Sequence, residues 1–391
     1  MALLLTPYDD RMRLGQGYNS FLQELRVDNA VTFDKEIMCP VAASQSTSAT
    51  QNISYSTKVV EKASHITEPM RISAASCIKQ GTVMLPGGGL SLDTATFPSS
   101  DLQALVSVKV VNRNNDSMYT VREIDSNEFH EIYGDSFISG FIEGGELHAV
   151  ISARVLEESN KDTLVSALEK ALNNCTEGKE STNSNPDSKN DLESAFSTHK
   201  HSISVNWVGG GQIRREDADW DLPSLFKVVS EYPDLVKKIP ARTYAILTKY
   251  DECPSFISWA RTREITIPQY ETANARAKEA FNAYMAYKRH LKLVQDALAQ
   301  PEKYKQNEAA GAVEMGVRAL IIARKAIRTE MAAIVEEVDK LDRMPESARE
   351  IKASTGLTGP EMWAARLPIC FDSPLLALPA TTNLAPGQGI Q

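Results

Sequence analysis

The sequence predicts an α+β fold in which a strand-rich region precedes a long helical hairpin. Strand-like and helix-like segments alternate through the N-terminal part of the chain, whereas the C-terminal part keeps a helical period. A third observation is a long strand candidate at residues 137–156 that contains glycines, so we expect it to bend. We therefore predict a sheet domain at residues 1–265, a helical hairpin at 266–344 and a tail rich in proline and glycine at 345–391. We expect the tail to wrap the surface or to be partly disordered.

Four segments of the N-terminal region have the character of strands, at residues 17–27, 102–112, 137–156 and 202–213. The second is dense in β-branched residues, as a half-buried strand requires. The third is longer than the 5–6 residues typical of a strand, at about 20. It includes Gly140, Gly144 and Gly145, which add no side chain to the packing and favour a bend. Further on, residues 222–239 have the period of a surface helix, and residues 241–250 have the pattern of a short strand.

Two inserts separate these strands, at residues 34–100 and 157–200. The first contains apolar residues at two-residue spacing, which predicts extended structure. The residues that define this pattern are Ile53, Tyr55, Val59, Met70, Ile72 and Ile78. The second insert opens with a helical face formed by Leu164, Leu168 and Leu172, and then becomes a polar stretch without periodicity.

The helical region carries a heptad seam on each of two helices, with Pro301 in the short connection that allows an antiparallel hairpin. The seam residues are Ala273, Ala277, Ala280, Tyr284, Tyr287, Leu291, Val294 and Leu298, then Val313, Val317, Leu320, Arg324, Ile327, Met331, Ile334, Val338 and Leu341. Two interpretations remain open: the hairpin packs on itself or on the sheet domain, or its seam recruits a partner chain.

Composition excludes several classes of protein. The chain has 391 residues and a formal charge of −9, with no basic face that would predict nucleic-acid binding. Five dispersed cysteines favour neither a disulfide framework nor a zinc site, and suit a reducing compartment. The N-terminus lacks the pattern of a secretory signal, and no apolar run approaches the roughly 20 residues of a spanning helix. We therefore expect a leaderless protein that is cytoplasmic or released without a signal.

Signals of enzymatic or metal chemistry are weak. The cluster Asp217, Asp219 and Asp221 lacks the glycine and glutamate of a calcium loop, so an acidic cluster in a loop or at a helix start is the better interpretation. His199 and His201 have the spacing of a metal pair, but no third ligand is near in sequence. The glycine run formed by Gly209, Gly210 and Gly211 lacks the lysine of a phosphate-binding loop. We expect no catalytic activity, no cofactor and no metal.

The segment YGDSFISGFIEGG at residues 133–145 is the most informative motif. An aromatic residue and a glycine are followed by a second aromatic residue and, six residues later, by paired glycines. Tyr133, Gly134, Phe137, Gly144 and Gly145 occupy these positions, and the pattern resembles the signature of the membrane-attack-complex/perforin (MACPF) superfamily. The Asp-Ser pair after Gly134 departs from the Thr-His pair of many members and is closer to stonustoxin-like ones.

The resemblance implies a bent, twisted four-stranded antiparallel sheet flanked by two helical clusters, with the paired glycines at the bend. It also implies that the two inserts are membrane-insertable, and that the protein is a pore former of the toxin or defence type. Such a protein oligomerises and inserts hairpins into a lipid membrane. The first insert has the alternation that a barrel strand needs, whereas the second is too polar to supply it readily. A non-lytic intracellular protein, which binds a protein partner through the helical hairpin, is therefore the alternative.

Overall fold

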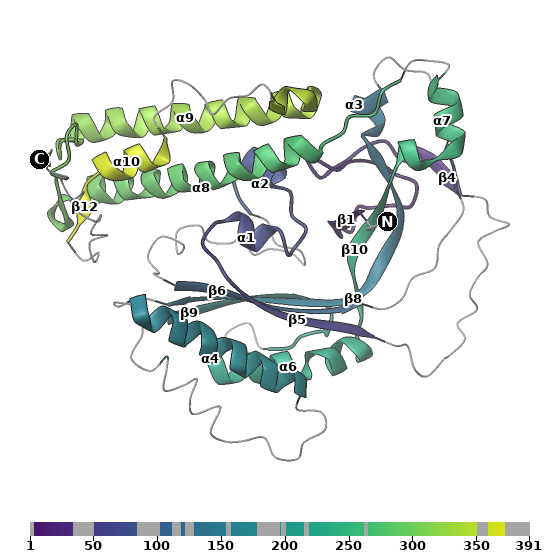
Figure 1. The fold of residues 1–391 in the computed structure, drawn as a ribbon, viewed down its shortest axis with the longest axis horizontal. Helices are drawn as coiled ribbons and strands as arrows, with labels where there is room; N and C mark the ends of the chain where they lie inside the picture. The colour runs from purple at the N-terminus through teal and green to yellow at the C-terminus, as the bar shows by residue number, and fades with distance from the viewer. Residues whose placement is uncertain are drawn as a thin grey trace, which may run out of the picture.

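The computed structural model describes residues 4–33, 51–83, 102–111, 119–121, 129–153, 158–177, 196, 201–214, 219–261, 265–349 and 359–371. Within them the chain has an α+β fold built around a large antiparallel sheet (Figure 1). Two helices cover one face of this sheet, and a long helical hairpin lies beyond the other face.

The central strand of the sheet is β8 (Ser136–Ala153), whose 18 residues confirm the long strand expected from the sequence. Seven further strands complete the sheet: β1 (Leu4–Pro7), β2 (Gly17–Asn19), β3 (Glu24–Leu25), β5 (Asn52–Val59), β6 (Leu102–Val111), β9 (His201–Val208) and β10 (Ala241–Lys249). The C-terminal half of β8 lies between β6 and β9, with β5 beyond β6. Its N-terminal half lies between β2 and β10, with β3 beyond β2 and β1 beyond β10.

The two halves of β8 meet at Gly144, which pairs with Val111 on one edge and with Ala241 on the other. Since β6 and β10 therefore occupy opposite edges, β9 and β10 follow one another along the same edge, in the same direction. Figure 1 shows β8 curving out of the plane that it shares with β5, β6 and β9 as it approaches α3. One strand thus belongs to two differently oriented halves of the sheet.

The prediction of four strands is wrong, because the sheet has eight. The predicted strand 17–27 divides into β2 and β3. Its turn is fixed by Asn19, whose side-chain oxygen accepts hydrogen bonds from the backbone nitrogens of Phe21 (3.0 Å) and Leu22 (2.9 Å). At the other end of the sheet, the predicted strand 202–213 stops at Val208, where three successive glycines take positive φ angles.

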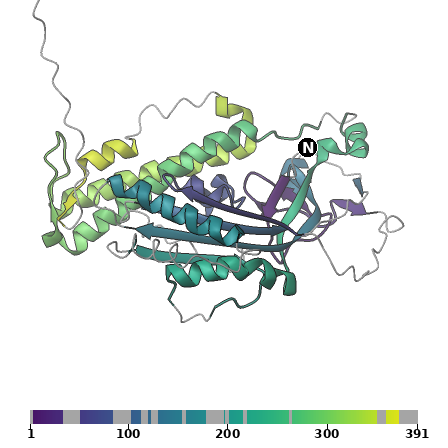
Figure 2. The same ribbon diagram turned by 60° about the horizontal axis from the view of Figure 1, so that its bottom comes forward.

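One face of the sheet is covered by α4 (Glu158–Glu177) and α6 (Leu222–Lys238), which Figures 1 and 2 both show side by side. The predicted helical face of α4 is buried there, through Leu164, Leu168 and Leu172. Asp221 caps α6 by accepting a 2.8 Å hydrogen bond from the backbone nitrogen of Ser224, so this acidic residue begins a helix, as the sequence analysis favoured. Asp217 and His199 lie outside the described residues.

The opposite face carries α1 (Ser64–Thr67) and α2 (Ala74–Gln80). In this structure Ile78 lies in α2, and Met70 and Ile72 lie in the connection between α1 and α2, so their two-residue spacing does not form a strand here. Ser73 accepts a hydrogen bond from the nitrogen of Ser76 at the start of α2, and Gly81 ends the helix with a φ of 69°. Ile53, Tyr55 and Val59 do lie in a strand, β5. The remainder of this insert, residues 34–50 and 84–100, is outside the described residues.

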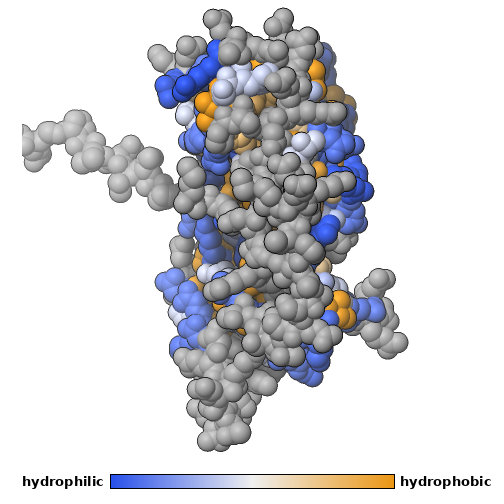
Figure 3. Space-filling model, turned by 90° about the vertical axis from the view of Figure 1, so that its right-hand side faces the viewer, coloured by the Kyte–Doolittle hydropathy of each residue, from blue (hydrophilic) through white to orange (hydrophobic). Residues whose placement is uncertain are grey.

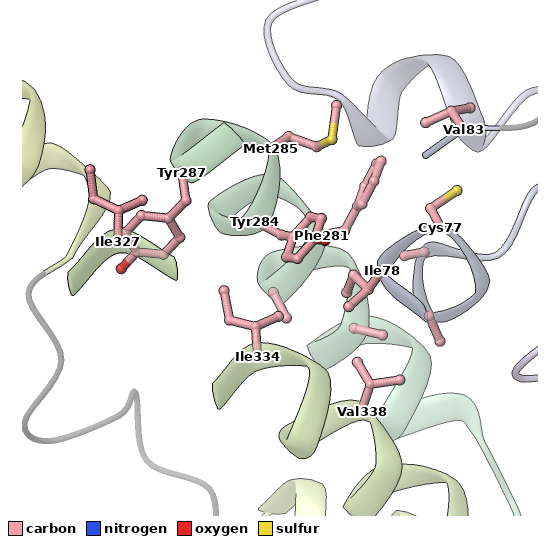
Figure 4. Close-up of a cluster of buried hydrophobic side chains, with 14 of the residues drawn as sticks. Cys77, Ile78, Val83, Phe281, Tyr284, Met285, Tyr287, Ile327, Ile334 and Val338 are labelled. Atoms are coloured by element: carbon pink, nitrogen blue, oxygen red, sulfur yellow. The ribbon is translucent and has the colours of Figure 1, made fainter. Parts of the chain in front are cut away.

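The helical hairpin consists of α8 (Glu271–Ala299) and α9 (Val317–Arg343), which confirms two long helices in this region. Most seam residues are buried between α8, α9 and α2 in one apolar cluster (Figure 4). Val317 is an exception with 65% of its surface exposed, and it is the first residue of α9, next to the connection between the two helices. The seam is thus filled from within the chain.

The structure describes residues 359–371 of the tail. Helix α10 (Pro360–Arg366) packs on the hairpin, where Trp363 and Leu367 join the apolar cluster. Strand β12 (Ile369–Cys370) then pairs with β11 (Tyr304–Lys305) in the connection between α8 and α9. Residues 359–371 therefore contribute to the core of the hairpin, and residues 372–391 lie outside the described part.

Short elements surround the N-terminal end of β8. They are α3 (Phe129–Tyr133), α7 (Pro254–Arg261), the small sheet of β4 (Val31–Phe33) and β7 (Tyr119–Val121), and the 3-10 turn η1 (Tyr250–Glu252). Two more 3-10 turns, η2 (Pro301–Lys303) and η3 (Pro345–Arg349), follow α8 and α9. The end of the molecule seen in Figure 3 is mainly hydrophilic where it is coloured, with apolar residues in small separate areas.

Candidate functional site

The paired glycines of the signature lie where the two halves of the sheet meet. A Cβ atom on Gly144 would come within 1.9 Å of the carbonyl oxygen of Val110 on β6. A Cβ atom on Gly145 would come within 2.3 Å of Val236 Cγ2 on α6. Both contacts are closer than any real Cβ allows, so only glycine lets β6 and α6 approach the central strand at this point.

The second glycine run closes the same junction from the neighbouring edge. Gly209 has a φ of 81°, and a Cβ atom there would lie 2.6 Å from the carbonyl oxygen of Gly144. Gly210 and Gly211 also have positive φ angles, and their backbone is held by Ile239 and Trp207 through hydrogen bonds of 2.8 and 3.0 Å. This run therefore turns the chain out of the sheet after β9, as the connection to α6 requires.

The first half of the signature is an aromatic anchor. Tyr133 stacks on Phe129 of α3 at 5.0 Å, and Phe137 packs against Tyr250 at 5.4 Å. Between them, Gly134 has a φ of 80°, and a Cβ atom on it would lie 2.1 Å from the carbonyl oxygen of Tyr18. The chain therefore crosses β2 at minimal separation before it enters β8.

The two faces of the sheet differ in chemistry, because successive side chains of a strand point to opposite faces. The face toward α4 and α6 is apolar, with contributions from Ala104, Val106, Val108, Val110, Leu147, Ala149 and Ile151. The intervening residues of the same strands, which face α1, include Ser107, Lys109, Glu146 and His148. Together with Tyr244 of β10 they form one polar network, which the sequence analysis missed because its members come from three strands.

Glu146 is the centre of this network. Its carboxylate accepts hydrogen bonds from Tyr244 Oη (2.5 and 2.6 Å) and pairs with Lys109 Nζ at 2.8 Å. Burial alone would raise the pKa of Glu146, but the hydrogen bond from His148 and the positive charges of His148 and Lys109 outweigh it and leave that pKa below its ordinary value. The same burial and the carboxylate charge raise the pKa of Tyr244. The network is thus built to keep Glu146 ionised.

Ser107, His148 and Glu146 also have the order of a hydrolase triad. His148 Nε2 lies 3.2 Å from Glu146 Oε2, and its Nδ1 lies 2.9 Å from Ser107 Oγ. Ser107 and His148 are each only 2% exposed, and the carboxylate is shared with Lys109 and Tyr244. A substrate has no access to this serine in the folded chain, so the arrangement is a structural network.

The α1–α2 segment, residues 60–83, is held on both sides. Toward the sheet, Ile66 and Met70 are buried against Leu105 and Val150, and Lys109 donates a 2.6 Å hydrogen bond to the carbonyl oxygen of Pro69. Toward the hairpin, five residues of the segment enter the large apolar cluster: Ala74, Ala75, Cys77, Ile78 and Val83. Of the candidate membrane residues, Met70, Ile72 and Ile78 therefore lie together in this layer, apart from Ile53, Tyr55 and Val59.

A second polar cluster joins the signature region to the hairpin. Asn19 donates a 2.8 Å hydrogen bond to Asp342 at the end of α9, and Tyr270 at the start of α8 contacts both Asp342 and His130. Burial raises the pKa of Asp342, but hydrogen bonds from His130 and Asn19 more than offset it and lower that pKa overall. These contacts fix one end of the hairpin beside the start of β8.

Neither metal chemistry nor membrane-spanning helices have support in the described ranges. There, no three His, Cys, Asp or Glu side chains gather as metal ligands would. No helix in the same ranges combines the length and the hydrophobicity needed to cross a bilayer. The three cysteines that can be described, Cys77, Cys253 and Cys370, are free thiols.

Comparisons with known proteins give weak likenesses. No protein-family model matches the sequence, and no curated protein matches it. Similar solved structures include stonustoxin, with 8% identity, a TM-score of 0.48 and coverage of 89% of this chain and 44% of that one. GNIP1Aa from Chromobacterium piscinae has 10% identity and a TM-score of 0.32, over 68% of this chain and 58% of that one. A protein with a MAC/Perforin domain from Bacteroides thetaiotaomicron has 12% identity and a TM-score of 0.22, over 73% and 62%.

The matched region thus spans less than two thirds of each of these structures. The assignment of a function rests on this chain's own motif and geometry.

Proposed function

We propose that this protein is a MACPF-like pore former that oligomerises on a lipid membrane and inserts β-hairpins from its helical inserts. The observation that carries the proposal is the junction at Gly144 and Gly145. The signature glycines stand at the bend of a long central strand, where their lack of side chains is required. A sheet that bends at such a point can change its curvature without removing side chains from the junction.

The first insert is placed so that it can lengthen an existing hairpin. Strands β5 and β6 pair antiparallel from Asn52 with Val111 to Val59 with Ala104, and residues 60–101 connect them. Refolded as an extension of this ladder, these residues give about 20 per strand, or roughly 65 Å at about 3.3 Å per residue. That length exceeds the hydrocarbon core of about 30 Å, even for tilted strands.

The sequence of the insert suits such an extension. Met70, Ile72 and Ile78 share one face in a two-residue period, whereas Arg71 and Lys79 share the other. A barrel strand needs this alternation between lipid and lumen. In the second insert, α4 has a helical period instead, so the proposal places the first hairpin at the centre of the activity.

The sheet also offers edges for association. In the described part of the chain, β5 and β9 each pair with one neighbouring strand. An incompletely paired antiparallel edge is a template for a strand from another copy, which would build a larger sheet from several chains. This is the geometry that supports homo-oligomerisation.

Release of a trapped dye from vesicles tests the proposal. Purified protein is mixed with phosphatidylcholine vesicles, with and without cholesterol and phosphatidylserine, that contain a small dye or a large dextran. The proposal predicts release of both, because a multi-chain barrel is wide. The absence of release from every composition would overturn it.

A matched pair of variants tests the alternation. Ile72→Asp places a charge on the proposed lipid face, where a charged side chain is unfavourable, and should abolish release. Arg71→Asp places the same charge on the proposed lumen face, and Arg71 is exposed with a φ of 58°, which aspartate tolerates. It should retain release. Circular dichroism of both variants verifies folding, and equal loss in both would contradict the hairpin.

The proposal gives Ser107, His148 and Glu146 no catalytic role. Ser107→Ala should therefore release dye at the wild-type rate, after correction for the folded fraction. Loss of release by a well-folded Ser107→Ala protein would instead favour a chemical function for this network.

A second candidate function is binding of a protein partner by the hairpin. The observation in its favour is a set of exposed apolar residues near one end of the hairpin: Val317, Ile321, Ile322, Met362 and Phe371. Exposed apolar side chains that gather at one place often mark an interaction surface. If wild-type protein forms no pores, an Ile321→Asp/Ile322→Asp variant that loses a specific partner would support this function.

A further inference from the structure

The α1–α2 segment is covered by an element that lies about two hundred positions later in the sequence. Figure 1 shows α1 and α2 between the sheet and the α8–α9 hairpin. Without the hairpin, the outward face of α2 would be exposed, although Ala75, Cys77 and Ile78 on it are each at most 2% exposed. The position of the segment therefore depends on the hairpin.

The apolar part of this contact is extensive. Figure 4 shows Cys77, Ile78 and Val83 facing Phe281 and Met285 of α8, with Ile334 and Val338 of α9 close by. On the sheet side, the apolar contribution of the segment is Val60, Ile66 and Met70. More of its buried apolar residues thus face the hairpin than the sheet, so separation from the hairpin is the larger step.

Polar contacts surround this apolar interface. Lys278 pairs with Glu68 at 2.7 Å, Lys79 pairs with Asp339, and Lys288 donates a 2.6 Å hydrogen bond to the carbonyl oxygen of Gly81. Ser64 and Asn282 exchange two hydrogen bonds, of 3.1 and 3.2 Å. Every hairpin residue in these contacts lies on α8 or α9, and every partner lies in the segment.

We propose that the α8–α9 hairpin is a latch that holds the α1–α2 segment in its helical form, and that release of this latch is the step that frees the segment. The effect of this release on membranes rests on the proposed function, because the freed segment forms part of the hairpin that inserts. The opening itself does not depend on the proposed function: the α1–α2 segment detaches from α8 and α9 while the rest of the fold persists.

The chain contains its own reporter for this opening. Cys77 lies on the α2 face against the hairpin, and burial raises its pKa to about 12, so it reacts slowly while the latch is closed. Cys253 is also buried, but in a different cluster with Phe129, Tyr250 and Phe256. The rate at which Cys77 is alkylated, relative to Cys253, therefore distinguishes local opening from global unfolding.

The test weakens the contact between the hairpin and the α1–α2 segment by changing charged side chains at its edge, so the buried apolar residues stay unchanged. Lys79→Glu with Lys278→Glu replaces two ion pairs by like charges opposite Asp339 and Glu68. Losing two exposed pairs should speed alkylation of Cys77 by about two- to thirtyfold. Cys253 should be unaffected. Adding Asp339→Lys and Glu68→Lys restores opposite charges and should return the rate toward that of the wild type.

The same three proteins are compared for dye release from the vesicles described above. The reversed-charge variant should release dye sooner than wild type, and the charge-swapped variant should release it more slowly than the reversed-charge one. Unchanged alkylation of Cys77, or equal acceleration of Cys77 and Cys253, would overturn the latch. If Cys77 responds as expected and no protein releases dye, the latch stands and the pore function fails.

Discussion

The glycine junction predicts a large difference between two substitutions on the same strand. Gly144→Ala would place a Cβ atom 1.9 Å from the carbonyl oxygen of Val110 and 2.9 Å from its carbonyl carbon. Because both atoms belong to the backbone of β6, relief requires that β6 and β8 separate locally. We expect about 1–3 kcal/mol from overpacking and about 1 kcal/mol for each ladder hydrogen bond lost. The free energy of unfolding should therefore fall by roughly 2–5 kcal/mol.

Gly140→Ala is the matched control. Its Cβ atom would meet only the end of the flexible Ile246 side chain, at 3.3 Å. Alanine in place of this glycine should be neutral or stabilise by up to about 1 kcal/mol, because glycine is poor in a strand. Urea unfolding followed by circular dichroism measures both variants. Equal stability of the two would refute the claim that the paired glycines are required at the junction.

Three further results are expected from urea unfolding. Gly134→Ala should destabilise by about 2–5 kcal/mol, because alanine must adopt a φ of 80° and clash with the Tyr18 carbonyl; stability within error of wild type would refute the close crossing. The pKa of Glu146 lies below 4.5 in the folded chain, so its stabilising contribution is present above pH 4.5 and is lost as the pH falls through the folded pKa. Glu146→Gln should therefore flatten the acid side of the pH–stability profile, and an unchanged slope would contradict this role. Leu320→Asp should lower the free energy of unfolding by about 4 kcal/mol or more, because it buries a charge. Ile322→Asp, two residues further along α9 at a position that is 61% exposed, should change it by at most about 0.5 kcal/mol. Equal effects would refute the internal seam.

Much of the fold was predictable where one local signal dominates. The heptad period predicted α8 and α9, and the glycine-containing β-rich run predicted β8, because each pattern reflects a single periodic environment. Most of the seam was also predictable, although Val317, the first residue of α9, is exposed. Asp221 was predictable as a helix start from its acidic side chain alone.

The remainder depends on contacts distant in sequence. Met70, Ile72 and Ile78 alternate as a strand would. However, Met70 is buried toward Leu105 and Val150 of the sheet, whereas Ile78 lies in α2 against the hairpin, so contacts distant in sequence override the local two-residue period. Similarly, residues 17–27 fold into two strands because the Asn19 side chain caps a turn, which a β-rich composition does not reveal. The Glu146 network could not be predicted, since Lys109 and Tyr244 meet it only through sheet pairing.

The two faces of the sheet differ in polarity, and this difference bears on which segment moves in the proposed insertion. The α1 side of β6 and β8 combines the polar Ser107, Glu146 and His148 with the apolar Leu105 and Val150, whereas the α4–α6 side is continuously apolar. Removal of α1 and α2 would therefore expose a surface that water can hydrate, at a smaller free-energy cost than exposure of the other face. This asymmetry is consistent with the first insert, rather than α4, as the segment that moves.

Electron microscopy of the protein after incubation with vesicles tests the central claim most directly. We expect membrane-bound rings in which the β5–β6 hairpin continues through residues 60–101 into the bilayer, and in which α1 and α2 no longer lie beneath the hairpin. Rings that retain α1 and α2 in place, or only monomers on every lipid composition that binds the protein, would contradict the claim.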